Sequence, residues 1–355
     1  MVYFFVAIVL FLFSLSFENR KYSKKQLSLI CLTSAIFLAL FEGLRWEIGT
    51  DWDPYYQYFR FLDNEHNEIG YYYITKAIRL FTDKYTFYLL LQAFFFYLTF
   101  AAFIIKHSDN PGISLTILYC SFLPFWGCNR QFLALTIIIL SIDFVLRRKF
   151  LPFFLCVAIA TSMHTTAIIF APVYFLYNFQ YKSSFVVVAS IVAIYVGAMG
   201  YLNNIPYLNL LAYMDDTSGD KMMAYLSKDI TGSFSIPGAM RRLLIVIGGL
   251  YVRPRIKDKT FDYFLIVYTI GAIIYLLFIS TQLQLIAGRG VMYFTVMEIV
   301  LVPQIIRSFT SNKSNRVIIW SVYFAILLYL LNRDLNYYYL MSGEEIFRPY
   351  KTIFN

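Results

Sequence analysis

Apolar stretches of about the length of a membrane span follow one another along most of the chain. A helix needs about 20 mostly apolar residues to cross a bilayer, and fewer when it is short or re-entrant. The pattern therefore predicts a series of membrane helices, including a shorter one at 240–252 that is bounded by arginines. The clear candidates are 2–17, 27–44, 86–105, 185–201, 261–280, 291–307 and 317–331.

Two further apolar regions are interrupted. Residues 113–146 contain Pro124 and Gly127, and residues 151–177 are broken by Ser162-Met163-His164. If each region is a pair of short helices with its break outside, the short basic loops all fall on one side, as the positive-inside rule requires. We therefore predict about 12 transmembrane or re-entrant helices with both termini outside. The basic loops are 20–25, 147–149, 253–259 and 313–316.

Two long loops, 45–85 and 202–240, and the tail from Asn332 are then predicted to face outside. Neither loop has the length or apolar content of an independent domain, so residues 1–355 are expected to form a single transmembrane domain. The first loop contains amphipathic stretches whose aromatic residues are typical of helices at the headgroup level. One predicted face carries Tyr55, Tyr58, Phe59 and Leu62, and another carries Tyr73, Ala77 and Leu80.

Composition supports this membrane interpretation. The 355 residues are 59% hydrophobic and only 14% charged, whereas soluble domains carry about 25% charged residues. No charged n-region precedes Val2 to Phe17, so this stretch is interpreted as a retained span rather than a signal peptide. The net charge of +9 is explained by topology and does not indicate nucleic-acid binding. The four cysteines lack metal-ligand spacing and are expected to be packing residues.

Charged residues gather at the predicted outer ends of helices. Arginines from several segments at one leaflet are the arrangement expected for an anionic ligand, because guanidinium groups bind phosphate in a bidentate manner. Snorkelling of arginines to lipid headgroups is the structural alternative. The residues concerned are Arg45, Glu47, Asp51, Asp53, Arg130, His164, Arg241, Arg242 and Arg289.

Several of these residues also have a structural interpretation. Asp53 before Pro54 is typical of a helix N-cap, and Gly49-Thr50 of a turn. Asp51 and Asp53 together suggest a metal-binding pair, but that spacing is common by chance, and no metal is predicted. His164 in an apolar run is expected to face a wet cavity or a protein interior, with a packing histidine as the alternative. Glu42 and Glu298 are expected to pair with arginines whose identity the sequence leaves open.

A series of short motifs resembles the EpsG-type exopolysaccharide polymerases, which are related to the Wzy O-antigen and capsule polymerases. The first and most specific is Arg45-x3-Gly49-Thr50-Asp51-x3-Tyr55. The others follow in the same order along nearly the whole chain. They are Glu68-x-Gly70-Tyr71, Asn129-Arg130-Gln131, His164-Thr165-Thr166-Ala167, Arg289 before Tyr293, and Pro349-Tyr350-Lys351.

The resemblance implies a multi-pass enzyme of the bacterial cytoplasmic membrane with its active site outside. It implies the GT-C-like architecture of glycosyltransferases that use lipid-linked donors. Such enzymes transfer a glycan from undecaprenyl pyrophosphate to a sugar hydroxyl of another lipid-linked repeat unit, without a cofactor. A chain-length regulator and a flippase are candidate protein partners.

The expected catalytic residues are Arg45 with Asp51 and His164, of which either of the last two is a candidate base. The expected binding residues are Arg130, Arg289, Arg241, Arg242, Tyr55, Tyr56 and Glu68. Trp46 and Trp52 are further candidates for stacking on sugars, with interfacial anchoring as the alternative.

Two other functions fit part of the pattern. Another lipid-linked glycosyltransferase or a glycan ligase would use the same arginines. A lipid-oligosaccharide flippase or other transporter is disfavoured, because transporters place charges near the bilayer midplane and consist of related halves.

Overall fold

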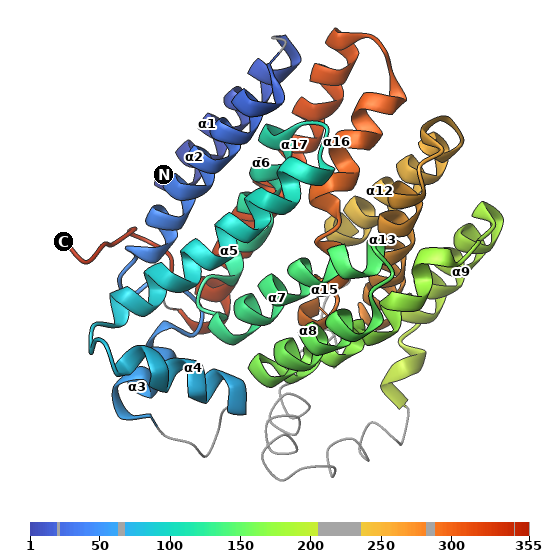
Figure 1. The fold of residues 1–355 in the computed structure, drawn as a ribbon. Coiled ribbons are helices and arrows are strands. Elements are labelled where there is room, and N and C mark those ends of the chain that lie inside the picture. Colours follow the sequence, from blue (N-terminus) through green and yellow to red (C-terminus); the bar gives the residue numbers. More distant parts are fainter. Residues whose placement is uncertain (20–21, 63–67, 205–235, 282–287, 344, 355) are drawn as a thin grey trace. The chain divides into compact units, whose positions relative to one another are not determined.

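The computed structural model describes residues 1–19, 22–62, 68–204, 236–281, 288–343 and 345–354. These residues form helices joined by turns, and no β-strand occurs among them (Figure 1). Arg45 and Thr352 form an isolated antiparallel bridge. The chain is an all-α membrane protein.

Five helices of the described part of the chain are long and apolar enough to cross a membrane. They are α2 (Lys24–Gly43), α5 (Tyr85–His107), α7 (Asn129–Leu146), α13 (Lys259–Phe278) and α17 (Lys313–Ser342). Shorter apolar helices are α1 (Val2–Asn19), α6 (Pro111–Phe122), α8 (Phe150–Met163), the 3₁₀ helix η2 (Thr165–Asn178) and α9 (Ser183–Ala198). All the predicted spans thus fall on helices, while their number across a bilayer stays a prediction.

The remaining helices are shorter or more polar. They are α3 (Trp52–Phe61), α4 (Ile69–Arg79), α12 (Ile236–Ile256), α15 (Met292–Thr295), α16 (Glu298–Phe309) and the 3₁₀ turns η1 (Leu123–Phe125) and η3 (Tyr201–Asn204). Both interrupted regions are helix pairs, broken at Trp126–Cys128 and at His164. The loop 202–240, predicted to face outside, lies beyond the described residues from 205 to 235.

Two predicted boundaries are wrong. The apolar stretch 291–307 is divided between α15 and α16 rather than forming one continuous helix. The tail expected from Asn332 continues as α17 as far as Ser342.

Local sequence signals explain where several helices begin. Ser23 and Gln26 form a capping box at α2, with each side chain bonded to the other's backbone N–H. Asn110 caps α6 and accepts from the N–H of Ile113, while Pro111 occupies the first turn, where its missing N–H costs nothing.

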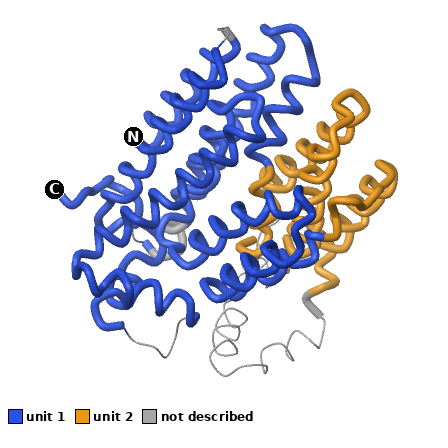
Figure 2. The backbone as a smooth tube through the Cα atoms, viewed as in Figure 1, with its two compact units in different colours: residues 1–174, 298–355 blue, residues 175–297 orange. Residues whose placement is uncertain are grey.

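The described residues divide into two compact units (Figure 2). Unit 1 comprises residues 1–174 and 298–355, and unit 2 comprises residues 175–297. In unit 1, α2 packs on α5, α1 on α6, and α7 on both α5 and α8. In unit 2, α13 packs against α9, α12 and α15. A glycine permits one of these contacts, because a Cβ at Gly197 would lie 1.9 Å from the carbonyl oxygen of Leu276.

Unit 1 has two chemically different ends. At one end Arg316 donates to Glu18 at 2.9 Å, so the end of α1 and the start of α17 lie near one another. At the other end Tyr3, Phe41, Trp126 and Tyr350 form an aromatic cluster with ring centroids 4.6 to 6.2 Å apart. The helices α3 and α4 and the breaks after η1 and α8 carry the motifs discussed next.

Candidate functional site

The chain turns sharply after α2, and Arg45 lies inside this turn. Its side chain is 1% exposed. It donates to the carbonyl oxygens of Glu42 at 2.9 Å and Ile48 at 3.3 Å, and pairs with the Glu42 carboxylate at 3.5 Å. The guanidinium lies over the Trp126 ring, 5.7 Å from its centroid. Arg45 thus joins both ends of the turn, and Glu42 pairs with an arginine as expected.

Two glycines bring this turn against the break between η1 and α7. The N–H of Thr50 donates to the carbonyl of Trp126 at 2.8 Å. Gly49 and Gly127 have φ angles of +121° and +108°, which favour glycine. A Cβ at Gly49 would lie 2.4 Å from the oxygen of Trp126, and one at Gly127 would lie 2.8 Å from the nitrogen of Asp51. Only glycine fits at these two positions. The close contact between the two backbone segments therefore sets the position of Asp51.

The C-terminal segment 346–353 covers the other side of the same turn. The N–H groups of Trp46 and Gly49 donate to the carbonyls of Lys351 and Ile346 at 3.0 and 3.1 Å. The Lys351 ammonium pairs with Glu47 at 3.0 Å. The Tyr350 hydroxyl donates to the carbonyl of Phe41 at 2.5 Å. The first and last motifs of the sequence are therefore one structural piece.

Asp51, rather than Asp53, occupies the N-cap position of α3. The helix begins at Trp52, so Asp53 lies in the first turn and Pro54 at its third position. The Asp51 carboxylate makes no capping hydrogen bond, and the Cys128 thiol lies 3.9 Å from its Oδ2 atom. The N-cap was predicted at Asp53, two residues further along the chain. Both are aspartates, which are equally common at N-caps, so residue type does not distinguish them. Its carboxylate keeps its acceptor capacity for a ligand.

Glu68 is the centre of a polar cluster from four segments. Its Oε2 accepts from Nη1 of Arg130, at the start of α7. Its Oε1 lies 3.1 Å from Nδ1 of His164 and accepts from the backbone N–H of Thr165 at 3.3 Å. Arg130 also donates from Nε to the Tyr55 hydroxyl at 2.8 Å. Tyr55, Glu68, Arg130 and His164 are thus brought together, and Thr165 joins them through its backbone.

A further glycine explains how Glu68 reaches His164. A Cβ at Gly70 would lie 2.3 Å from the Ser162 hydroxyl and 2.8 Å from the Ser162 carbonyl oxygen. The start of α4 therefore lies directly on the end of α8. His164 ends α8 in an extended conformation, with φ −156° and ψ 115°, which turns the chain into η2.

Electrostatics keep Glu68 ionised. Burial alone would raise the pKa of this carboxyl, but the hydrogen bond with His164 and the charge of Arg130 outweigh it and lower the pKa to about 2. Within the described residues, Nε2 of His164 and Nη2 of Arg130 have no hydrogen-bond partner. A carboxylate bound at Nδ1 fixes the imidazole ring and directs Nε2 elsewhere.

Aromatic residues enclose the cluster on the side of α3. Tyr55 contacts Tyr71 edge to face at 5.6 Å. Tyr56 stacks on Trp52 at 4.9 Å, and both contact Trp46. Trp52 is 7% exposed, and its indole N–H has no acceptor among the described residues.

The two predicted amphipathic faces lie differently in the fold, and their position at the headgroup level stays a prediction. Tyr55, Tyr58 and Phe59 are buried. In α4 the buried side chains are Tyr71 and Thr75, whereas Tyr73 is 60% and Leu80 79% exposed. The predicted face is thus the outer one, because Gly70 forces the opposite side of α4 onto α8.

Three predicted arginines belong to unit 2. Arg242 lies 3.6 Å from the centroid of the Tyr275 ring and donates to the carbonyl of Gly238 at 3.0 Å. Arg241 lies beside it in α12, and Arg289 lies half-buried just before α15. Their convergence with the residues of unit 1 stays a prediction.

The sequence did not predict the contacts of Cys128 and Asn129, and it left the partner of Glu298 open. The sequence predicts a packing role for Cys128, yet its thiol lies between Thr50, 3.6 Å away, and Asp51. Its place one residue before Asn129-Arg130 is the available signal. Asn129 donates to the Tyr85 hydroxyl at 2.9 Å. Glu298 accepts from the Tyr323 hydroxyl. Across the described ranges, no three His, Cys, Asp or Glu side chains form a metal-binding group.

Comparison with known proteins agrees with this arrangement of motifs. No curated protein and no solved structure gives a significant match to the chain. A family profile described as the EpsG family matches residues 28–352, nearly the whole chain and every motif from Arg45 to Lys351. The chain therefore belongs to the EpsG family of membrane-embedded polysaccharide polymerases.

Proposed function

We propose that the protein transfers a growing glycan from undecaprenyl pyrophosphate to a sugar hydroxyl of a second lipid-linked repeat unit, at the outer face of a bacterial cytoplasmic membrane. The observation that carries the proposal is the cluster around Glu68. It combines a histidine with an available ring nitrogen and an arginine with an available N–H pair, next to an aromatic surface.

The chemistry is a single displacement at the anomeric carbon of the donor. The acceptor oxygen forms a bond to this carbon, the bond to the pyrophosphate oxygen breaks, and the electron pair leaves with the lipid pyrophosphate. The acceptor hydroxyl gives up its proton. Such a step needs a base near the hydroxyl and a cation near the leaving group.

We assign the base to Nε2 of His164. Glu68 binds the other ring nitrogen at 3.1 Å and stabilises the imidazolium that forms on proton transfer. Asp51, the other candidate, is assigned to a hydroxyl of the acceptor sugar, because its carboxylate at the start of α3 has free acceptor capacity.

The leaving pyrophosphate is assigned to Arg130. Nε and Nη1 are held by Tyr55 and Glu68, which fixes the guanidinium plane and leaves Nη2 for the anion. Sugars are assigned to Trp46 and Tyr56, whose half-buried rings can stack on them, with the buried Trp52 ring packed against both. Arg45, enclosed in its turn, is assigned to positioning Asp51. This assignment does not require the substrate-binding roles that the sequence predicts for Arg241, Arg242 and Arg289.

The test is incubation of the purified protein with an undecaprenyl-pyrophosphate repeat unit. A ladder of products supports the proposal. A single block added to a different acceptor indicates a ligase, and transfer across the membrane without new bonds indicates a flippase; either result rejects polymerisation.

His164→Ala should abolish the ladder while the protein still inserts. His107→Ala is the matched control. His107 is the last residue of α5, outside the Glu68 cluster, and pairs with Asp143 at 3.4 Å. Asp51→Asn should retain slow extension. An active His164→Ala beside an inactive Asp51→Asn would transfer the role of base to Asp51.

A further inference from the structure

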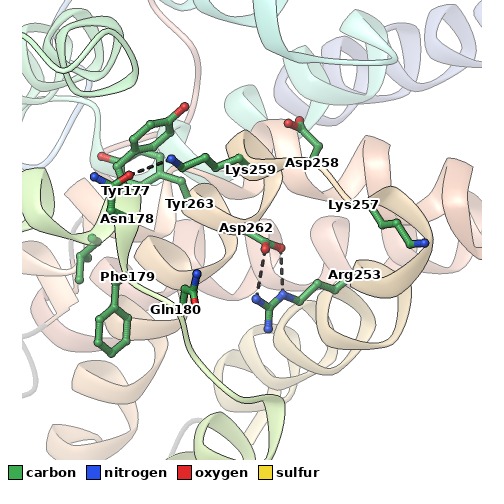
Figure 3. Close-up of a pocket in the computed structure, with 11 residues that line it drawn as sticks. Tyr177, Asn178, Phe179, Gln180, Arg253, Lys257, Asp258, Lys259, Asp262 and Tyr263 are labelled. Atoms are coloured by element: carbon green, nitrogen blue, oxygen red, sulfur yellow. Dashed lines mark hydrogen bonds and ion pairs between the residues drawn. The ribbon is translucent and has the colours of Figure 1, made fainter.

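Unit 2 contains a cavity of about 540 Å³ that the polymerase chemistry does not use (Figure 3). Its walls are the end of η2 with the residues after it, the end of α12 and the start of α13. Because α13 is a candidate membrane span that begins at Lys259, the cavity lies at the level where a span meets the headgroups.

One wall is fixed by an ion pair. Arg253 donates to both carboxylate oxygens of Asp262 at 2.9 and 3.1 Å (Figure 3). It also donates to the carbonyl of Tyr181 at 3.0 Å. Its guanidinium also stacks on the Tyr181 ring at 4.1 Å. These contacts neutralise Asp262 and hold the ends of α12 and α13 together.

Two lysines at the cavity have no carboxylate partner among the described residues. Lys259 donates to the neutral amide oxygen of Asn178 at 2.8 Å and lies over the Tyr177 ring. Lys257 is exposed, and its ammonium makes no hydrogen bond or ion pair within the described part of the chain, while its backbone N–H donates to the carbonyl of Arg253 at 3.2 Å. Asp258, between them, is engaged in capping the N–H of Thr260 at 3.0 Å. The cavity therefore offers positive charge.

Lys257 also has an unusual backbone. Its φ is +50°, a left-handed conformation that glycine or asparagine adopts more readily than lysine. A lysine at a turn position suited to smaller residues points to a use for its side chain. Figure 3 shows its amine directed away from Lys259, and its flexible stem allows it to turn toward an anion.

The other side of the cavity is apolar and exposed. Leu176 and Phe179 line it, and Phe179 is 52% exposed. Phe175, further back on η2, is 62% exposed. A ligand that meets both the ammonium groups and these rings has an anionic head and a hydrocarbon tail. The volume is within the range of about 300–1,000 Å³ that is common for ligand pockets.

We propose that this cavity binds the headgroup of an anionic phospholipid. The phosphate pairs with Lys257 and Lys259, hydroxyls of the headgroup bond to Asn178 and Gln180, and the acyl chains follow Phe179 and Phe175. The ligand chemistry is a phosphate diester, and the source is the membrane rather than soluble phosphate. The site is independent of glycan transfer and would exist whether or not the chain polymerises sugars.

The experiment titrates the full-length protein in detergent with short-chain phosphatidylglycerol and follows bound lipid by native mass spectrometry. Lys257→Asn with Lys259→Gln should weaken binding about 30-fold, since each basic residue near an anionic lipid contributes severalfold. Asparagine suits the left-handed position, so the turn is retained. The control, Lys24→Gln with Lys25→Gln, removes the same charge from the exposed first turn of α2 in unit 1 and should bind as the wild type does.

Three outcomes would overturn the proposal. Equal binding of phosphatidylglycerol and phosphatidylcholine would remove the role of the anion. Equal losses in both double variants would indicate diffuse charge attraction. Displacement of the lipid by inorganic phosphate at a similar concentration would make the site one for a soluble anion. None of these readouts depends on polymerase activity.

Discussion

The burial of Arg45 changes what a substitution there should do. An incoming pyrophosphate would have to displace three groups that already accept from its guanidinium: the two carbonyls of Glu42 and Ile48 and the Glu42 carboxylate. Removing one member of a buried ion pair costs roughly 3–5 kcal/mol, because the other charge is left without compensation. Arg45 is better suited to holding the turn than to binding a leaving group at the surface.

Arg45→Lys should therefore lower stability as well as activity. A lysine ammonium cannot reproduce the planar fork that joins Ile48 to Glu42, and one unsatisfied buried acceptor costs about 1–3 kcal/mol. The measurement is the thermal midpoint of the purified variant beside its chain-extension rate. Lys351→Gln, which loses an exposed pair with Glu47, is the control and should shift the midpoint little. An unchanged midpoint with a lost rate would restore a pyrophosphate role for Arg45.

The low pKa of Glu68 predicts a definite pH dependence. Its folded pKa of about 2 lies below its ordinary value of 4.5, so the folded state favours the carboxylate. The resulting stability is fully present above about pH 4.5 and is lost as the pH falls toward 2. Glu68→Gln should lower the thermal midpoint at pH 7, and the gap to wild type should narrow below pH 4.5. A gap that is constant from pH 7 to 3 would contradict the ion pair, and Asp83→Asn serves as the exposed control.

At the scale of elements, the sequence predicted the helices well and their contacts less well. The break at Pro124–Gly127 and the break at His164 were predictable because each contains residues that interrupt an apolar run. The outward face of α4 was not predictable, because its orientation depends on the contact between Gly70 and Ser162, two segments far apart in sequence. Glu68 and His164 were each predicted as site residues, but only this contact explains why they meet.

The close contact at Gly49 and Gly127, which fixes the position of Asp51, gives a prediction at the scale of elements. Gly127→Ala places a Cβ 2.7 Å from the Thr50 nitrogen and 2.8 Å from that of Asp51, at a φ angle that strains alanine. The turn must move, and chain extension should fall at least tenfold at matched protein level. Gly288→Ala is the control, because a Cβ there meets no heavy atom within 4 Å. Polymer of wild-type length from Gly127→Ala would mean that this approach does not position Asp51.

At the scale of the whole molecule, hydropathy identifies the spans but leaves their assembly open. The stretch 291–307 is mostly apolar, yet the boundary between the two compact units falls inside it, between Met297 and Glu298. Hydropathy does not reveal such a boundary, because apolar residues lie on both sides of it. The pairing of residues 44–49 with 346–353 was also beyond prediction, although each motif had been noticed, because it depends on backbone hydrogen bonds that most side chains permit.

Sidedness is the prediction on which the location of both sites depends. The positive-inside rule places the basic turn 253–259 in the cytoplasm and α3 outside. A membrane-impermeant thiol reagent on intact cells should then label Gln57→Cys, which is exposed on α3, and should label Lys257→Cys only after the cells are permeabilised. Position 220, in the second outer loop, lies outside the described residues and is a further candidate for external labelling.

The background for this test should lack the four native cysteines without disturbing the site. Cys31, Cys120 and Cys156 can be replaced by alanine, whereas Cys128 is better replaced by serine, because its side chain contacts Thr50 and Asp51. Chain extension by this background confirms that the fold is intact. Labelling at position 257 in intact cells, with protection at position 57, would show that the protein has the opposite orientation in the membrane. The Glu68 cluster would then face the cytoplasm, and the lipid site of unit 2 would belong to the outer leaflet.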